Sequence, residues 1–247
     1  MIDDDTANKG SKLDNGWDQS AAAWIADLQR GGGARDYVLD APMLARLRGR
    51  GFERAVDVGC GEGRFCRMMQ VLGIATVGID PTLALLDQAR TLDPQGDYRH
   101  GVAERLAFDD GAFDLVVSYL TLLDIADIDA AIPEMVRVLR PGGTLLIANM
   151  TSFYTAGPPE GWTNDHDGTP RFVIDDYMDD RADWVGWRGV HIQNHHRPLS
   201  RYMSLLLAQG LILRHFDEPQ PHDGDADYRQ RYRRVPYFLL MEWQKPG

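Results

Sequence analysis

Apolar residues recur at helical spacing near the start of the chain. Between residues 17 and 29 they form one stripe, which predicts an amphipathic helix, and three consecutive glycines at 31–33 end it. A second short helix is expected over 41–47, with Pro42 in its first turn. Residues 1–16 are polar and are expected to form a flexible tail.

In the middle of the chain, short segments typical of strands alternate with segments typical of helices. Short apolar runs predict buried strands over 55–58, 75–79, 97–102, 113–119 and 144–149. Segments between them predict helices over 64–72, 81–90 and 128–139, the last broken by Pro141-Gly142-Gly143. Strands that alternate with helices indicate an α/β fold with a parallel sheet, doubly wound by right-handed crossovers.

This alternation lapses over 150–197 and then resumes. The lapse contains short strand candidates at 171–174 and 188–193. A helix is expected over 199–209 and strands over 211–216 and 237–243, with an arginine-rich loop between the last two. The prediction is therefore a seven-stranded sheet in one domain, 17–247, with N-terminal helices over 17–50 and an insert over 150–197.

Composition narrows the choice of partner and chemistry. The 247 residues carry 26 Lys+Arg against 37 Asp+Glu, a formal charge of −11, which disfavours nucleic acid or an anionic membrane as the main partner. The only lysines are Lys9, Lys12 and Lys245, so the sequence offers no lysine for a P-loop or a pyridoxal Schiff base. We expect a cytoplasmic protein, because two cysteines cannot staple this chain and no signal peptide or membrane span is visible.

The densest motif lies between the first predicted strand and the next helix. Asp57-Val58-Gly59-Cys60-Gly61-Glu62-Gly63 has three glycines in five residues, which let the backbone approach a ligand at a helix N-terminus. Asp80 closes the next strand, where a carboxylate can accept hydrogen bonds from both hydroxyls of a ribose. The spacing departs from the dinucleotide pattern G-x-G-x-x-G, because position 64 is Arg. The alternatives are a tight turn for the glycines and a helix cap for Asp80.

These residues resemble the first two motifs of the class I S-adenosylmethionine (SAM)-dependent methyltransferases, and the resemblance continues in order along the chain. Val77-Gly78-Ile79-Asp80-Pro81-Thr82 is similar to the second-strand acid motif. The stretches 102–108 and 113–118 are similar to the adenine-binding loop and the fourth strand, and 137–145 to the motif before the fifth strand. The match covers about 54–150 and is nearest to small-molecule enzymes of methyltransferase type 11.

The resemblance implies a Rossmann-like sheet whose last strand is antiparallel, and it implies SAM as cofactor, with S-adenosylhomocysteine as product. The residues expected to bind the cofactor are Arg35, Asp57, Gly59, Cys60, Gly61, Gly63, Asp80, Pro81, Thr82, Ala103, Glu104 and Ser118. Many relatives carry an acid where Val102 stands, so the adenine contact is expected from Glu104, the backbone near Ala103, or water. Arg35 is expected to pair with the methionine carboxylate, its alternative being a surface arginine.

The insert is the expected substrate lid. It contains Phe153, Tyr154, Trp162, Tyr177, Trp184 and Trp187, which suit a flat or apolar small molecule or, equally, a small satellite core. Tyr119 lies where relatives place the transferring methyl group. His196 is the expected general base, because imidazole takes up a proton near neutral pH. A structural role for His196 is the alternative, and the spacing of His191, His195 and His196 is not diagnostic of a metal site; no metal is predicted.

The function predicted from these features is methyl transfer from SAM to O or N of a small, aromatic or apolar molecule. Three alternatives stay open. An RNA or protein methyltransferase is disfavoured by the net charge. A non-catalytic SAM-binding protein would bind without turnover. A nicotinamide dehydrogenase is disfavoured by the glycine spacing and by the absence of a Tyr-x-x-x-Lys pair.

Overall fold

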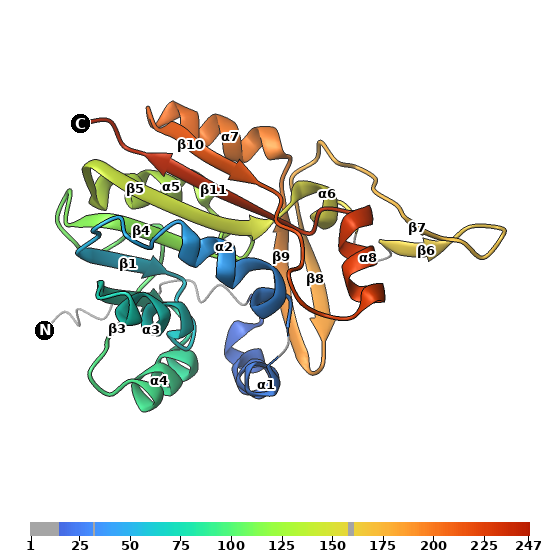
Figure 1. Ribbon diagram of the computed structural model, residues 1–247, viewed down its shortest axis with the longest axis horizontal. Helices are drawn as coiled ribbons and strands as arrows, with labels where there is room; N and C mark the ends of the chain where they lie inside the picture. The colour runs from blue at the N-terminus through green and yellow to red at the C-terminus, as the bar shows by residue number, and fades with distance from the viewer. Residues whose placement is uncertain (1–14, 32, 158–160) are drawn as a thin grey trace, which may run out of the picture.

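The centre of the computed structural model, which describes residues 15–31, 33–157 and 161–247, is a seven-stranded sheet. Its strand order is β10-β11-β5-β4-β1-β2-β3, and only β11 runs against its neighbours (Figure 1). This confirms the predicted α/β fold and its reversed last strand. The strands are Arg54–Val58 (β1), Ala75–Asp80 (β2), Asp97–His100 (β3), Phe113–Tyr119 (β4), Leu139–Met150 (β5), Ile212–Asp217 (β10) and Phe238–Gln244 (β11).

Helices cover both faces of the sheet, because side chains alternate along each strand. On β1, Val56 packs with the face covered by α5 and α7, whereas Ala55 packs with the face covered by η1, α2 and α3. The helices are Trp17–Arg30 (α1), the π-helix Arg35–Leu39 (η1), Asp40–Ala45 (α2), Arg64–Val71 (α3), Leu83–Leu92 (α4), Ile128–Val138 (α5), Ser152–Thr155 (α6), Leu199–Ala208 (α7) and Ala226–Arg234 (α8). Every one of these helices, which belong to the described residues, is too short or too polar to cross a bilayer.

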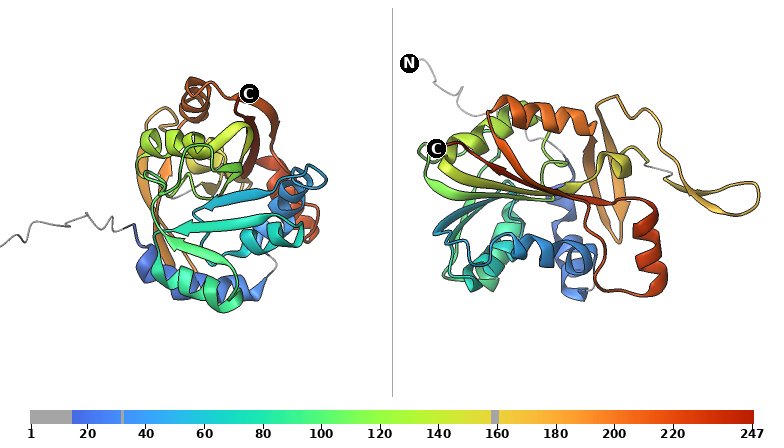
Figure 2. Two further views of the ribbon diagram at one scale, coloured as in Figure 1. Left: turned by 90° about the vertical axis from the view of Figure 1, so that its left-hand side faces the viewer. Right: turned by 45° about the horizontal axis from the view of Figure 1, so that its top comes forward.

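The insert consists of α6 and two hairpins. Trp162–Asn164 (β6) pairs with Pro170–Phe172 (β7), and this hairpin projects from the body of the molecule (Figures 1 and 2). Arg181–Trp187 (β8) pairs with Val190–His196 (β9), and α1 packs against β9 and α4. The N-terminal helix and the second hairpin therefore meet beside the sheet, although they are far apart in the sequence.

Several predicted elements need correction. The helix expected over 81–90 begins two residues later, because the Asp80 carboxylate accepts a hydrogen bond from the Thr82 N–H and forms a turn first. The break predicted at Pro141-Gly142-Gly143 is absent, because these residues lie within β5. There the Gly142 N–H donates a hydrogen bond to the Lys245 carbonyl near the C-terminus. The arginine-rich segment is a helix, α8, capped by Asp225, rather than a loop. Strands β6 and β8 and helix α6 were not predicted, and the predicted tail over 1–16 lies outside the described residues except for its last two.

Candidate functional site

The glycine motif forms the turn between β1 and α3. Gly59 has a φ of +77°, and a Cβ there would lie 2.1 Å from a Thr121 side-chain carbon. Gly61 also has a positive φ, +55°, but a Cβ there would meet open space. Gly59 therefore serves close packing and turn geometry, while Gly61 leaves room for a ligand beside the backbone.

Asp80 lies opposite this turn at the end of β2. Its Oδ2 accepts the Gly61 N–H at 2.9 Å and its Oδ1 accepts the Thr82 N–H at 2.8 Å. Burial raises the pKa of this carboxyl, while the two backbone hydrogen bonds lower it. The Thr82 side chain also hydrogen-bonds this carboxylate. Because a carboxylate accepts about four hydrogen bonds in all, it keeps capacity for a further donor. The helix-start role and a ligand-binding role are therefore compatible.

Asp57 is the second buried acid of the motif. Its Oδ2 lies 3.6 Å from the Cys66 Sγ, and its Oδ1 has no hydrogen-bond partner among the described residues. Burial raises the pKa of Asp57 to about 7, the Cys66 thiol lowers it, and the charge of Asp80 raises it further. A buried oxygen without a donor is costly, and a ligand that brings an N–H group would remove that cost.

A large cavity connects these groups. It has a volume of about 1160 Å³ and is bounded by the ends of β1, β2 and β4, by α1 and η1, and by the second hairpin of the insert. Gly63 and Ser118 do not line it: Gly63 packs on the Tyr98 ring and Ser118 is buried in β4. The sequence-predicted residues that line it are Arg35, Asp57, Gly59, Cys60, Gly61, Asp80, Pro81, Thr82, Ala103, Glu104 and Tyr119.

An ion-pair network fastens the N-terminal helices to the glycine loop. Arg64, the residue that departs from the dinucleotide pattern, donates to Asp40 at 2.8 Å and to Asp36 at 2.5 Å. The Tyr119 hydroxyl donates to the same Asp40 carboxylate at 2.7 Å. Burial and the Asp40 charge raise the pKa of Tyr119 well above its usual value, so this phenol stays protonated at neutral pH.

Arg35 stands beside this network and lines the cavity. Its guanidinium lies 4.7 Å from the centre of the Trp24 ring. Burial lowers its pKa, and the positive charge of Arg64 lowers it further. Within the described part of the chain no carboxylate lies at ion-pair distance from Arg35. A half-buried cation that lacks such a partner suits an anionic ligand group.

The structure does not bring His196 into the cavity. Its ring is buried, with Nδ1 at 2.8 Å from the Thr155 hydroxyl and Nε2 at 3.0 Å from the Tyr177 carbonyl. Burial lowers its pKa. Because both ring nitrogens are occupied inside the insert, this geometry favours a structural role, and the predicted base role gains no support from it.

Arg197 is likewise directed away from any ligand. It is buried and donates to the carbonyls of Leu122 at 3.2 Å, Ile125 at 2.7 Å and Ala126 at 2.9 Å. Beside it, the His195 N–H donates to the Leu123 carbonyl at 2.7 Å. The segment that leads into α7 therefore braces the loop after β4, a relationship that sequence spacing does not reveal.

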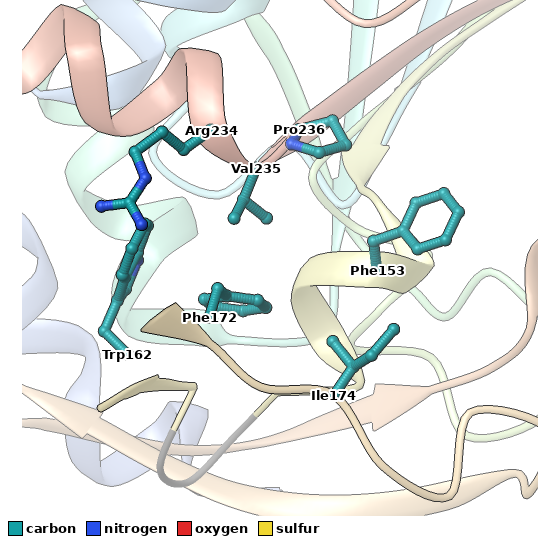
Figure 3. A pocket seen from close by; sticks show the side chains of 7 residues that line it. All are labelled: Phe153, Trp162, Phe172, Ile174, Arg234, Val235 and Pro236. Atoms are coloured by element: carbon teal, nitrogen blue, oxygen red, sulfur yellow. The ribbon is translucent and has the colours of Figure 1, made fainter. Parts of the chain in front are cut away.

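The aromatic residues of the insert divide among different surroundings. Trp187 lines the large cavity and contacts Trp24, with ring centres 6.0 Å apart. Trp184 lies outside it and stacks on His191. A separate, smaller cavity of about 260 Å³ lies between α6, β7 and the end of α8 (Figure 3), and it is lined by Phe153, Trp162, Phe172, Ile174, Arg234, Val235 and Pro236. Most of the predicted lid rings therefore pack within the insert.

Sequence reasoning missed a polar group that lines the large cavity. Asp124 follows β4, and its carboxylate accepts the Asn194 side-chain N–H at 2.7 Å. Trp17, from the start of α1, also bonds this carboxylate. No sequence motif links Asp124, Asn194 and Trp17, because these three residues meet only when α1 and β9 pack over the loop. Leu120, with a φ of +58°, marks the same loop as strained backbone.

Comparison with known proteins identifies the family. The methyltransferase domain family matches residues 56–147, from β1 to β5. A SAM-dependent methyltransferase from Mesorhizobium loti matches with a TM-score of 0.76 at 27% identity, over 87% of this chain and 99% of that one. The methyltransferase domain of this chain, residues 56–147, belongs to the class I SAM-dependent methyltransferases. This confirms the family predicted from the glycine and acid motifs, and SAM is the cofactor of that family.

Curated relatives match this chain over shorter stretches. A malonyl-[acyl-carrier protein] O-methyltransferase of Serratia marcescens is 31% identical over 150 residues, which cover 60% of this chain and 56% of the relative. A ubiquinone biosynthesis O-methyltransferase of Maricaulis maris is 35% identical over 121 residues, 47% of this chain and 48% of the relative. The chain thus spans about half the length of the curated relatives it matches.

The large cavity suits SAM on grounds that do not depend on the family match. Asp80 retains acceptor capacity for hydroxyls, and the buried Asp57 oxygen lacks a donor. Arg35 is a half-buried cation that also lines the cavity, and a Cβ at Gly61 would meet open space. SAM carries a diol, an ammonium and a carboxylate, so its polar groups match these residue types in kind.

Proposed function

We propose that this chain catalyses methyl transfer from SAM to an oxygen or nitrogen atom of a small molecule. The observation that carries the proposal is the size and make-up of the cavity. At about 1160 Å³ it exceeds the roughly 300–1,000 Å³ of a usual ligand pocket, so two ligands can share it. The glycine loop and Asp80 line this cavity, and so do Trp187, Ile192 and Asn194 of the insert.

When bound, SAM supplies a methyl group on a positively charged sulfur, ready for displacement. The chain's own residues have three tasks in this proposal. Asp80 accepts hydrogen bonds from the ribose hydroxyls and Arg35 pairs with the carboxylate, which together orient the cofactor. Trp17, Trp24 and Trp187 exclude water from the reacting atoms. Tyr119, whose hydroxyl is engaged by Asp40, shapes the wall rather than moving a proton.

Oxygen is favoured over nitrogen as the methylated atom. Both curated relatives are named as O-methyltransferases, one acting on a malonyl group on acyl-carrier protein. We therefore propose that the present chain catalyses O-methylation. The acceptor in this proposal is a small aromatic or apolar molecule, and the setting is cytoplasmic. Trp187 supports an apolar acceptor, because its ring lines the cavity next to Trp24.

The test is transfer of a labelled methyl group. The purified chain is incubated with SAM labelled in its methyl group and with small phenols, carboxylic acids, malonyl thioesters and amines, beside separate reactions with bulk RNA and protein. We expect the label in a small product and none in the polymers. Binding of S-adenosylhomocysteine without transfer to any small acceptor would favour a non-catalytic SAM-binding protein, and label in RNA or protein would contradict the small-molecule proposal.

A further inference from the structure

The loop after β4 presents one carboxylate to the large cavity. Asp124 lines this cavity and is half-buried. Its carboxylate accepts the Asn194 Nδ2–H group at 2.7 Å and also bonds the Trp17 side chain. The three residues come from the loop, from β9 and from α1, so the two covering elements both converge on this carboxylate.

The loop holds Asp124 in a fixed position. The Arg197 guanidinium bonds the carbonyls of Leu122, Ile125 and Ala126, on both sides of Asp124. The Asp124 N–H bonds the Thr121 carbonyl at 2.8 Å within the loop. A carboxylate supported in this way loses little further freedom when a ligand binds, which is the condition for precise proton transfer.

The charge of Asp124 is not balanced by the protein. Among the described residues no cation lies within ion-pair distance of it. The nearby Arg197 guanidinium donates its hydrogen bonds to backbone carbonyls instead. Burial raises the pKa of Asp124 well above its ordinary value near 3.8; the Asn194 hydrogen bond lowers it, the charge of Asp80 on β2 raises it, and the Trp17 hydrogen bond lowers it. The carboxylate is therefore more basic than a surface aspartate and still has capacity for another donor.

We propose that Asp124 is the catalytic base of the methyl transfer, and that the acceptor therefore bears a hydrogen on the atom that is methylated, as in a phenol or an amine. This inference rests on the proposed function. In the step, the acceptor atom forms a bond to the methyl carbon while the bond between that carbon and the cofactor sulfur breaks. The proton of the acceptor passes to an Asp124 oxygen and later to water, and the sulfur keeps the electron pair of the broken bond.

A purely structural role is the competing explanation, because Asp124 also ties β9 to the loop through Asn194. Asp124→Asn separates the two roles. The new amide keeps an oxygen that can accept the Asn194 N–H, but it cannot take up a proton at neutral pH. Asn194→Ala does the reverse, since it removes the tie and keeps the carboxylate. Asp129→Asn is the matched control, because Asp129 is exposed and pairs with Arg201 on the surface.

Kinetics with an acceptor found in the labelled-methyl assay form the first arm. We expect Asp124→Asn to lower kcat by roughly 10²–10⁴ and to remove the acid limb of the pH profile, and Asp124→Glu to restore part of the rate. Affinity for S-adenosylhomocysteine should stay within about twofold of wild type, as should all parameters of Asp129→Asn. A wild-type enzyme that turns over while Asp124→Asn keeps its rate or its acid limb overturns the Asp124 proposal alone. A wild type that binds the product and methylates nothing overturns the proposed function as well.

Carbon-13 spectroscopy of the aspartate carboxyls gives a second readout that needs no turnover. The protein is saturated with S-adenosylhomocysteine, the Asp124 signal is identified from its loss in Asp124→Asn, and phenol, benzylamine and benzoate are added in turn. We expect this signal to titrate above the ordinary value and to shift with phenol or benzylamine, which bring donors. An ordinary titration, or a shift with benzoate alone, contradicts the proposal.

Discussion

The Arg197 guanidinium donates to the Ile125 carbonyl at 2.7 Å and thereby joins the end of the insert to the loop after β4. The same guanidinium also donates to the Leu122 and Ala126 carbonyls of this loop. The buried guanidinium replaces the water that these carbonyls would otherwise bind, so the three hydrogen bonds stabilise the observed conformation of the loop. Asp124 and Thr121, which line the cavity, owe their positions to this brace.

Replacement of Arg197 by Met should loosen that loop. The change leaves three carbonyls without their donor, so we expect the free energy of unfolding to fall by about 2–4 kcal/mol. Denaturant unfolding measures the loss, and hydrogen exchange should speed up at the amides of 123–126. Arg201→Met is the matched control, because Arg201 makes an exposed ion pair with Asp129, and it should change stability by less than about 1 kcal/mol. Equal losses in both variants would show that Arg197 has no special role.

Replacement of Asp80 by Asn should weaken cofactor binding. The carboxylate loses its charge while its shape is kept, and hydrogen bonds to a charged acceptor contribute roughly 1.5–3 kcal/mol each. Calorimetry with S-adenosylhomocysteine should then give a Kd roughly 10- to 100-fold higher. Asp97→Asn, at an exposed Asp–Arg pair on the neighbouring strand, should leave the Kd unchanged. An unaltered Kd in Asp80→Asn would disprove the ribose contact.

Arg35 can be tested with two nucleosides that differ in one part. S-adenosylhomocysteine carries the amino-acid carboxylate, whereas methylthioadenosine lacks it. Arg35→Met keeps apolar contact with Trp24 but removes the cation, so we expect weaker binding of the first by roughly 10- to 100-fold and unchanged binding of the second. The exposed Arg48→Met provides the control. A parallel loss for both nucleosides would mean that Arg35 shapes the cavity without contacting the carboxylate.

Trp187 and Trp184 form a natural pair for a test of acceptor binding. Both belong to β8, but only Trp187 lines the large cavity. Trp187→Ala should raise the KM for the acceptor about tenfold or more and leave affinity for S-adenosylhomocysteine near wild type, because a ring that covers the acceptor is removed. Trp184→Ala removes a stack on His191 and should leave KM unchanged. The insert would lose its assigned influence on the acceptor if the two variants behaved alike.

The buried His196 predicts a pH dependence of stability. Burial lowers its pKa below the usual 6.5, so the folded protein disfavours the protonated ring that the unfolded chain accepts. Stability should therefore fall as the pH drops below about 6.5, since only the unfolded state binds the proton there. His195, whose pKa burial also lowers, contributes in the same direction. Thermal unfolding between pH 5 and 8 measures the effect, and His196→Gln should flatten the curve in part. An unchanged slope would contradict the assignment to His196.

Much of the cofactor-binding part of the fold could be predicted from the sequence, because its residues lie close to one another along the chain. The glycine loop, Asp80 and the strand periods all have local causes: backbone φ angles, helix starts and apolar alternation. Ser118 does not line the cavity, since the alternation that makes β4 a strand also directs that side chain into the core. Helix α8 was missed because its arginines hide the apolar stripe formed by Tyr228, Tyr232 and Val235.

The sequence by itself determined the fold class, the family and the cofactor, because these depend on local spacing and on motifs that follow one another in order. Only the tertiary structure decided which side chains face the acceptor. The His196 ring lies inside the insert, Arg197 donates hydrogen bonds to the loop after β4, and Asp124 lines the cavity. Each position depends on contacts between segments about twenty to a hundred residues apart. Long-range packing of α1 and β9 over the loop sets those orientations, and no local pattern records them.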